Sequence, residues 1–338
     1  MIRSSFLCAL AALVALAIPA AASTLEDVRE RGTLVCGVNA PLAGFGTVDA
    51  SDHWAGFDVD LCHALAAAVL GDPARVRYVA SHGDDGFAAL ARGDLDVLVR
   101  GVLWSFRHDV QQAFDFAAVS YYDSQGFMVR KDLGVSSAKE LDGITICVRS
   151  GGAAEQNLKS FLRVNNLGST AFPAGDEAEA QRLYLAGECD AYSANVSTLA
   201  AARATMAGGD AHTILPETIS KEPLGPAVRH GDNQWEDIVR WTFLALLIAE
   251  EKGITRANID EVASSSADPD VRRLLGRESD TGAPFGLDAD WARRAIAAGG
   301  NYGEIFEANI GAATPIGLSR GLNALWTQGG LHYPPPIR

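Results

Sequence analysis

The amino-acid sequence predicts an α/β protein made of two lobes. Short apolar runs typical of strands alternate with helical stretches, once after Gly32 and again from about Ile144. Such alternation predicts mainly parallel sheets that are covered by helices. With 338 residues, of which 48% are hydrophobic, the chain is long enough to bury a large core and to divide into two domains.

The N-terminus has the pattern of a secretory signal. Arg3 is followed by an apolar run, Phe6–Ile18, and then by three small residues that end at Ala22. The apolar run is too short for a membrane-spanning helix, and Cys8 lacks the small residues that precede a lipid-anchor site. We therefore expect cleavage near Ala22 and export of a soluble protein.

The first series predicts three strands and two helices in the order β-α-β-α-β. Its elements are Leu34–Val38, a helix from Asp58, Val76–Ala80, a helix over Asp84–Ala91, and Leu95–Val99. Gly56 supplies the turn before the first helix, and the Asp58 carboxylate can accept hydrogen bonds from the free amides of its first turn. Gly71 ends this helix. Its apolar residues fall on one face, which predicts an amphipathic helix: Val59, Cys62, Ala66, Val69 and Leu70.

The second series has the same order, and two segments connect it with the first. Its elements are Ile144–Val148, a helix over Ala153–Asn165, Thr170–Pro173, a helix over Glu177–Ala186, and Cys189–Ala194. The chain crosses over at Tyr121–Gly126, ahead of an apolar strand at Phe127–Val129, and returns at Lys221–Pro226. Proline and glycine at the return crossing fit a pair of hinge strands.

These crossings predict that the second lobe is inserted into the first. From Trp235 the chain is helical, with a long helix over Asp237–Glu251 followed by Val271–Leu275 and Trp291–Ala297, and these segments should pack on the first lobe. The expected divisions are a signal peptide at 1–22, a discontinuous first lobe at 23–125 and 227–338 with the helical extension, and a second lobe at 126–226.

Removal of the signal leaves four cysteines: Cys36, Cys62, Cys147 and Cys189. An even number in an oxidising compartment predicts disulfides, and four cysteines allow three pairings. We expect Cys36 to pair with Cys62 and Cys147 with Cys189, since each pair brackets one structural unit. No CxxC motif or histidine cluster accompanies them, so we expect no metal.

The charge of the chain excludes several classes of partner. Lys and Arg number 28 against 42 Asp and Glu, which gives a net charge of −14. Nucleic acids and anionic membrane surfaces are therefore not expected partners. The one strongly apolar run after the signal, Trp241–Ala249, has about half the length needed to cross a bilayer.

Several motifs resemble one family of proteins. Gly56–Leu61 is similar to the signature of the periplasmic solute-binding proteins of amino-acid ABC importers, bacterial solute-binding family 3. Further motifs resemble its general L-amino-acid-binding subgroup: Cys36–Asn39, Asp115–Phe116, Tyr121–Phe127, Ile219–Pro226, Asn301–Glu307 and Leu322–Thr327. The resemblance extends from about Thr24 to Arg338.

This resemblance implies the two-lobed periplasmic-binding-protein fold of type II, which closes about a hinge, with a helical C-terminal extension. It also implies a location in the periplasm and a function. The protein would capture a small polar solute, an amino acid or a related compound, and deliver it to an ABC permease in the inner membrane. We expect a monomer without a cofactor. The ligand is not fixed by the resemblance, because one fold serves many ligands.

Ligands of parallel α/β lobes bind beyond the carboxyl ends of strands, so the loop after the Leu95–Val99 strand is the first candidate. There the family carries threonines and an arginine that grips the α-carboxylate of the ligand. Here Val102 and Leu103 stand in place of threonines, and His108 in place of the arginine. Arg107, one position earlier, is our candidate for the carboxylate contact.

Each residue of this loop has an alternative interpretation. Arg107 could be a surface arginine paired with Asp109, and His108 a solvated or internally satisfied histidine. Trp104 keeps its position in the family and could form a wall of the cleft, with Ser105 beside it, or belong to the core.

Three further positions complete the expected site. Ser150 and Gly151 follow a strand and open a helix, where backbone amides can hold an anion, and no Gly-Lys-Ser/Thr follows that would favour a nucleotide loop. Asn195 stands where the family presents an aspartate to the α-ammonium of the ligand. Phe45 matches the stacking aromatic of the family, the alternative being a packing residue at a loop edge.

The scaffold thus matches the family while the amino-acid clamp does not. We therefore expect an atypical ligand, or weak binding of ordinary amino acids. A ligand sensor for a membrane receptor and a cleft enzyme of the dehydratase type are the alternatives. Glu155 is the one acid that we place in the cleft, without a partner acid or base, so we expect no catalytic residues.

Overall fold

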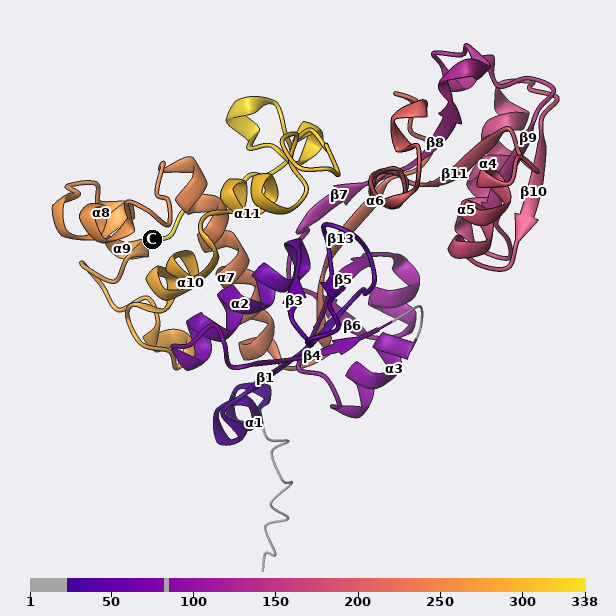
Figure 1. Cartoon of the computed structure of the whole chain (residues 1–338). Coiled ribbons are helices and arrows are strands. Elements are labelled where there is room, and N and C mark those ends of the chain that lie inside the picture. Colours follow the sequence, from indigo (N-terminus) through magenta and orange to yellow (C-terminus); the bar gives the residue numbers. More distant parts are fainter. Residues whose placement is uncertain (1–22, 82–84) are drawn as a thin grey trace, which may run out of the picture.

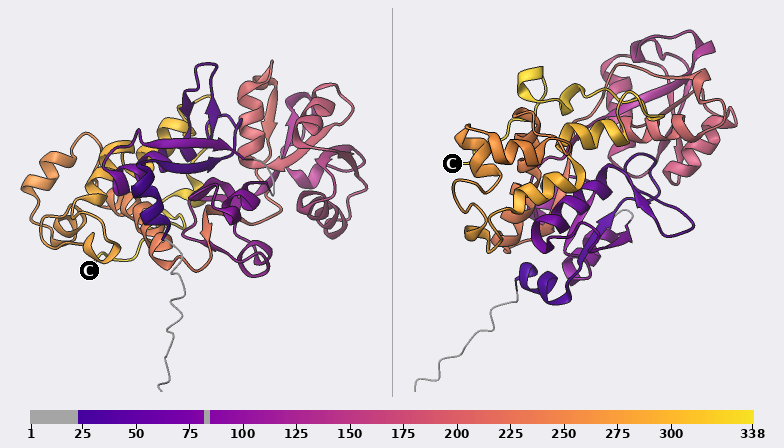
Figure 2. Two further views of the ribbon diagram at one scale, coloured as in Figure 1. Left: turned by 90° about the horizontal axis from the view of Figure 1, so that it is seen from below. Right: turned by 60° about the vertical axis from the view of Figure 1, so that its left-hand side comes forward.

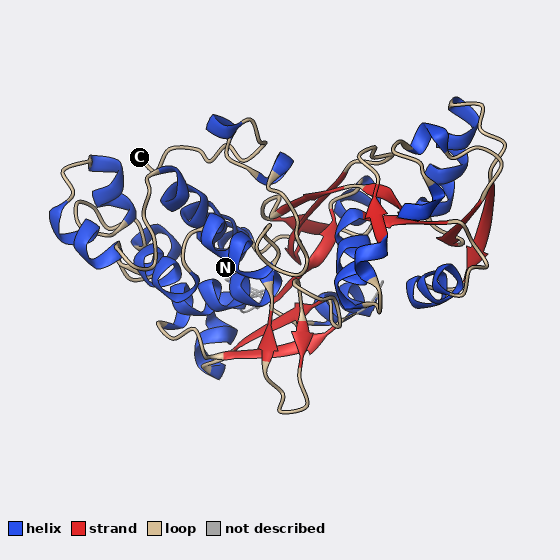
Figure 3. Ribbon diagram, turned by 45° about the horizontal axis from the view of Figure 1, so that its top comes forward, coloured by secondary structure: helices blue, strands red, loops and turns tan. Residues whose placement is uncertain are grey.

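The computed structural model describes residues 23–81 and 85–338. The expected signal segment, residues 1–22, lies outside this described part. Two main β-sheets organise the protein, and helices cover each of them (Figures 1 and 3). The predicted alternation of strands and helices is therefore confirmed, twice over, in one chain.

The first sheet has the strand order β4-β1-β5-β13-β6, and β7 also pairs with β13. Strands β1, β4 and β5 are parallel, whereas β13 runs antiparallel to β5, β6 and β7. The bounds are β1 Leu34–Val38, β4 Val76–Ala80, β5 Val97–Leu103, β6 Phe114–Phe116, β7 Tyr121–Asp123 and β13 Glu222–Arg229. Helices α1 (Thr24–Arg31), α2 (Phe57–Leu70) and α3 (Asp85–Arg92) and a small hairpin of β2 (Thr47–Val48) and β3 (Trp54–Ala55) complete this half of the chain.

The second sheet has the order β10-β9-β11-β8-β12. Strands β9, β10 and β11 are parallel, and β8 is antiparallel to β11 and β12. The strands are β8 Gln125–Arg130, β9 Thr145–Arg149, β10 Thr170–Ala174, β11 Ala191–Asn195 and β12 His212–Ile214. The main helices are α4 Ala153–Val164, α5 Glu177–Leu185 and α6 Val196–Thr205.

The C-terminal third of the chain is helical and packs on the first sheet's side of the molecule (Figure 2). Its main elements are α7 Asn233–Glu251, α8 Ile259–Ser265, α9 Pro269–Leu274, α10 Trp291–Gly299 and α11 Tyr302–Asn309, followed by the short turns η6 Gly321–Asn323 and η7 Trp326–Gln328. Helix α10 packs against α2 more extensively than any other helix does. In the part of the chain that the structure describes, no helix is long and apolar enough to cross a membrane.

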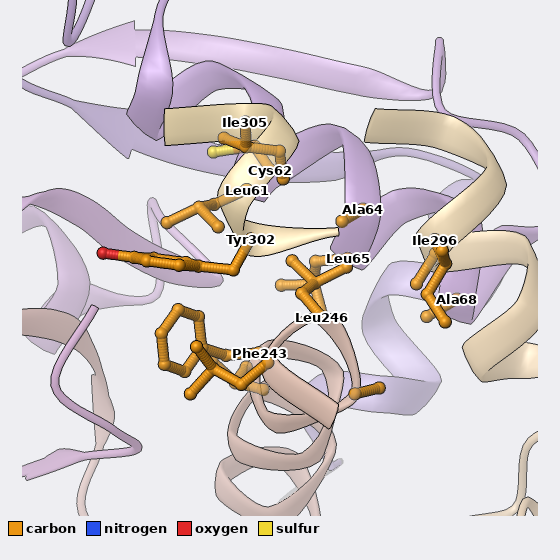
Figure 4. Packing of buried hydrophobic residues seen from close by; sticks show 14 of the residues in the cluster. Leu61, Cys62, Ala64, Leu65, Ala68, Phe243, Leu246, Ile296, Tyr302 and Ile305 are labelled. Carbon is orange, nitrogen blue, oxygen red and sulfur yellow. The ribbon is translucent and has the colours of Figure 1, made fainter. Parts of the chain in front are cut away.

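Helix α2 differs from the expected amphipathic helix in two ways. Among its residues only Asp60, His63 and Leu70 escape full burial, because α7, α10 and α11 cover the side that was expected to face water (Figure 4). Gly56, and not Asp58, is the N-cap residue, and no side chain makes a cap hydrogen bond there. Asp58 is the second residue of the helix and is buried. The expectation of a single buried face was wrong because distant segments supply the second cover.

Both expected disulfides are present in the structure. Cys36 in β1 is bonded to Cys62 in α2, and Cys147 in β9 to Cys189 just before β11, with Cα–Cα distances of 6.4 and 5.6 Å. Each ties a central strand of one sheet to a neighbouring element. In the chain-entropy model, closing loops of this length stabilises the fold by about 3–4 kcal/mol each.

A buried histidine makes the stability of the fold dependent on pH. His332 is 2% exposed and packs against the rings of Tyr302, Tyr122 and Phe243. Burial, together with the positive charge of Arg320, lowers its pKa from 6.5 to about 3. Between these two values the unfolded chain binds a proton that the folded chain does not, so His332 costs stability as the pH falls.

We predict that His332→Phe removes this cost. Relative to wild type, the free energy of unfolding of the variant should rise as the pH falls from about 6.5 toward 4, by up to about 1.4 kcal/mol per pH unit. Urea denaturation at several pH values measures this difference, with the exposed His53→Phe as a matched control. A difference for His332→Phe that is the same at every pH would contradict the prediction.

Candidate functional site

The candidate site is built around the two places where the chain passes between the sheets. Strand β7 ends at Asp123 in the first sheet and β8 begins at Gln125 in the second, so that Ser124 alone separates them. On return, β13 pairs antiparallel with β7, with Glu222 opposite Asp123. Gly225 is needed on this strand because a Cβ atom there would lie 1.8 Å from the carbonyl oxygen of Ala118. The two crossings therefore lie side by side, as predicted for hinge strands.

Asn195, at the end of β11, points toward these crossings. Its Nδ2 atom donates to Glu222 Oε2 at 2.6 Å and lies 3.3 Å from Asp123 Oδ2. Ser197 Oγ donates to the same Asp123 Oδ2 atom at 2.5 Å, and Asp123 Oδ1 accepts from the Ser124 amide at 2.9 Å. The other oxygen of Glu222, Oε1, accepts from Ser220 Oγ at 2.8 Å. The neutral amide thus serves as a shared donor between two carboxylates.

Asp123 is unusually easy to protonate in this setting. Burial, helped by the charge of Glu222, raises the pKa of Asp123 to about 6, against the hydrogen bonds from Ser197 and Ser124. The carboxyl group therefore changes its charge close to neutral pH. These two acids were not singled out from the sequence, although both lie in the crossing segments that predicted the hinge.

Strand β5 runs on to Leu103, beyond the strand end expected at Val99. Pairing of β13 with β5 at Leu224–Leu103 and Gly225–Val102 explains the extension. Val102 is 2% exposed and packs in a core cluster, so this apolar residue lies inside the sheet. The candidate loop therefore starts at Trp104.

Trp104 lies at the surface of the first half and not in its core. Its ring stacks on Phe116 at 5.6 Å, its indole nitrogen donates to Asp109 Oδ2 at 2.8 Å, and 38% of the residue is exposed. Arg107 begins the turn Arg107–Gln111 and is exposed. Both residues remain candidates for ligand contact, with Trp104 held in place by its own neighbours.

His108 is fixed in orientation by the loop around it. Its Nδ1 atom lies 2.9 Å from the carbonyl oxygen of Leu103 and 3.1 Å from Ser105 Oγ, and its ring stacks on Phe87 at 4.4 Å. Because a carbonyl oxygen only accepts, Nδ1 carries a proton and the other ring nitrogen, Nε2, is left for another partner. Ser105 is used in holding this ring.

The expected anion cradle at the start of α4 is occupied by the chain itself. The Gly151 amide donates to Glu155 Oε2 at 2.9 Å, and Lys159 Nζ to Glu155 Oε1 at 2.6 Å. The hydrogen bonds of Lys159 and Gly151 lower the pKa of Glu155. Ser150 also bonds internally, because its hydroxyl and its amide both donate to the carbonyl oxygen of Ala174 at 2.9 Å. A ligand anion would have to displace Glu155 to use the Gly151 amide.

Phe45 is buried in this structure. Its ring is 4% exposed and meets Tyr121 and Phe57 edge to face, with centroid distances of 5.3 and 6.1 Å. Phe45 thereby supports the first residue of the crossing strand β7. Its expected contact with a ligand stays a prediction, as do those of the other residues of the expected site.

Residues 34–252 match the sequence model of bacterial extracellular solute-binding proteins, family 3. The chain belongs to this family. It is 60% identical over 330 residues to the glutamate/glutamine/aspartate/asparagine-binding protein BztA of Rhodobacter capsulatus, covering 98% of this chain and 97% of BztA. The general L-amino acid-binding periplasmic protein AapJ of Rhizobium johnstonii is 51% identical, with 94% of each chain covered.

A solved structure extends the likeness to three dimensions. The ABC transporter/periplasmic binding protein from Brucella ovis with glutathione bound has a TM-score of 0.89 and 46% identity, covering 94% of this chain and all of that one. The fold is therefore the two-lobed periplasmic-binding-protein fold of type II. Since these family members are named as binding proteins, the chain is a solute-binding protein and not an enzyme. Within the described residues, no group of three or more His, Cys, Asp or Glu residues is placed to hold a metal ion.

The raised pKa of Asp123 predicts a second pH dependence, opposite in sign to that of His332. An ordinary aspartate has a pKa of about 3.9 in the unfolded chain, so protonation of Asp123 stabilises the folded state most below about pH 4. This contribution is lost as the pH rises through about 6.

Relative to Asp123→Asn, wild type should therefore lose up to about 1.4 kcal/mol of stability per pH unit between about pH 4 and pH 6. Urea denaturation of both proteins across this range measures the effect. Asp190→Asn is a matched control, because hydrogen bonds from Thr145 lower the pKa of that carboxyl and its difference should stay flat. The prediction fails if the Asp123→Asn difference is equally flat.

Proposed function

We propose that the chain captures a small polar solute between its two lobes in the periplasm and delivers it to an ABC permease of the inner membrane. The expected lobes are residues 23–125 with 227–338, and 126–226. By strand pairing, Gln125 goes with the second sheet and residues 222–226 go with the first, so we place the joint at residues 124–125 and 220–221. Residues 1–22 act as the signal peptide, and the mature protein acts as a monomer. Family membership supports this proposal, as do the two adjacent crossings, which allow the lobes to close by bending at a few residues.

We infer further that the ligand is not an ordinary zwitterionic L-amino acid, or that such amino acids bind weakly. The observation that carries this inference is the state of Asn195, at the position where the family has an aspartate. Its amide carries no charge and donates to Glu222 and Asp123. Loss of one partner of a buried, hydrogen-bonded charge pair costs about 2–5 kcal/mol, which weakens binding tens- to thousands-fold.

The carboxylate side of the clamp is altered as well. His108 stands where the family has its arginine, and an imidazole cannot make the bidentate contact of a guanidinium. In our proposal Arg107 and His108 Nε2 contact the acidic end of the ligand, with Trp104 as a wall and Ser105 holding His108. From the second lobe, the ligand is contacted by Ser150, Gly151 and Asn195. Phe45 belongs to the part of the site that the first lobe supplies.

The relatives give two classes of ligand to test. BztA is named for four amino acids, glutamate, glutamine, aspartate and asparagine, whereas the Brucella ovis protein holds glutathione, a tripeptide. The altered clamp favours a ligand of the second kind, with groups beyond the α-carboxylate and α-ammonium. A peptide-like solute offers amides that can form hydrogen bonds with Asn195 and with the imidazole of His108.

A thermal-shift panel tests this inference on the wild-type protein. At about 100 times its Kd, a ligand raises the free energy of unfolding by about 2.7 kcal/mol. Standard L-amino acids at about millimolar concentration should give small shifts, and glutathione or other short peptides larger ones. Strong shifts with several standard amino acids would overturn the inference while leaving solute binding itself intact.

Restoring the clamp should increase the affinity for amino acids. In the double variant His108→Arg with Asn195→Asp, the two charges usual in the family return, and glutamate should bind at least about tenfold more tightly by calorimetry. Without ligand, the new carboxylate repels Asp123 and Glu222, so the variant should lose stability as the pH rises and regain it with ligand. Asn165→Asp, which adds the same charge at the end of α4, is the control. An unchanged glutamate affinity in a folded double variant would count against the altered clamp as the cause.

A further inference from the structure

The outer edge of the crossing strand β7 is paired with a side chain from the C-terminal extension. Tyr122 donates its amide to Asn323 Oδ1 at 2.7 Å, and Asn323 Nδ2 donates to the carbonyl oxygen of Tyr122 at 3.1 Å. The carboxamide thus satisfies both backbone groups of Tyr122 in the way that a neighbouring strand does. On its inner edge β7 pairs with β13, so this short strand is held from both sides.

Asn323 is itself firmly placed. It is 4% exposed, at the end of η6, and its carbonyl oxygen accepts hydrogen bonds from Arg320 Nε and Nη2 at 3.1 and 2.9 Å. The Arg320 guanidinium also pairs with Glu250 of α7 at 3.0 Å and lies 5.1 Å from the centre of the Tyr302 ring. A buried carboxamide with this support has little freedom to leave Tyr122.

Two more contacts of the extension reach the same strand. Tyr302 OH donates to the carbonyl oxygen of Ser120, directly before β7, at 3.0 Å. The His332 ring packs at 5.2 Å from the ring of Tyr122, and His332 is joined to the region of Asn323 by a bridge with Leu325. In Figure 1 this yellow C-terminal segment lies beside β7. The extension therefore holds residues 120–122 by three contacts: the hydrogen bonds of the Asn323 carboxamide, the hydroxyl of Tyr302 and the ring of His332.

These contacts come from outside the part of the chain that matches the family model, which ends at residue 252. Hinge motion is absorbed by a few residues whose backbone is free to change conformation. A contact that fixes the backbone on one side of a hinge therefore leaves the bending to residues farther from that contact.

We propose that Asn323 is a positioning residue that keeps β7 a rigid part of the first lobe. Bending is then confined to the residues between the sheets, Ser124 with Gln125 on one crossing and Ser220 with Lys221 on the other. We call the pairing of Asn323 with Tyr122 the brace. The bending residues flank Asn195, Asp123 and Glu222, so the brace makes the candidate ligand site itself the moving joint. The importance of this joint for solute uptake rests on the proposed function. The proposal that Asn323 keeps β7 rigid does not depend on that function.

The test compares Asn323→Ala with Asn309→Ala in the full mature chain. Asn309 is a matched carboxamide of the same extension, but it donates to Asp60 Oδ2 and to the carbonyl oxygen of Ile305, away from the hinge. Spin labels at two exposed positions, Arg92→Cys in the first lobe and Val164→Cys in the second, report the distance between the lobes without ligand. Hydrogen exchange reports the Tyr122 amide.

Asn323→Ala should make the Tyr122 amide exchange about tenfold faster and broaden the distribution of distances between the lobes. Asn309→Ala should leave both unchanged even where it lowers the melting temperature as much. A folded Asn323→Ala protein with the distance distribution and Tyr122 exchange of wild type would overturn the brace. Because these readouts need no solute, failure of the brace is distinguishable from failure of ligand capture, which would instead show as no solute-dependent change in the wild-type distance.

Discussion

The antiparallel pairing of β7 with β13 is the constraint on which the rest of the structure depends. The chain passes between the two sheets at these strands, and their register sets Asp123 opposite Glu222. At the end of β11 the Asn195 amide faces both of these acids and contacts each carboxylate. The joint between the lobes and the centre of the candidate site are therefore one structure.

The C-terminal extension changes the meaning of local patterns in the first lobe. Helix α2 was expected to be amphipathic because its apolar residues fall on one face, yet α7, α10 and α11 cover its other side, and Asn309 donates to Asp60. A local sequence pattern indicates the face of a helix that packs on its own sheet. It does not indicate a second layer of helices that comes from over two hundred residues further along the chain. The same extension holds Tyr122, which no pattern in residues 121–126 indicates.

Much of the fold could be predicted because it follows from local periodicity and from spacing. Strand β1, helix α4 and both disulfides lie where apolar runs, helix signals and bracketing predicted them. The candidate site was less predictable, since what a donor does depends on side chains that meet only in the folded chain. The Gly151 amide is at the predicted helix start, but Glu155, one turn further along, already occupies it. Strand β5 continues to Leu103, beyond its expected end at Val99, because β13 pairs with it.

In our proposal the altered clamp, and not the scaffold, determines which solute this protein binds. The most direct measurement is a crystal structure of protein purified from its native export compartment without denaturation, with the retained solute also identified by mass spectrometry. We expect a solute with polar groups beyond those of a single standard amino acid, contacting Asn195 from the second lobe and the loop of Arg107 and His108 from the first. An ordinary L-amino acid held by its α-ammonium at Asn195 and its α-carboxylate at Arg107 would contradict the account.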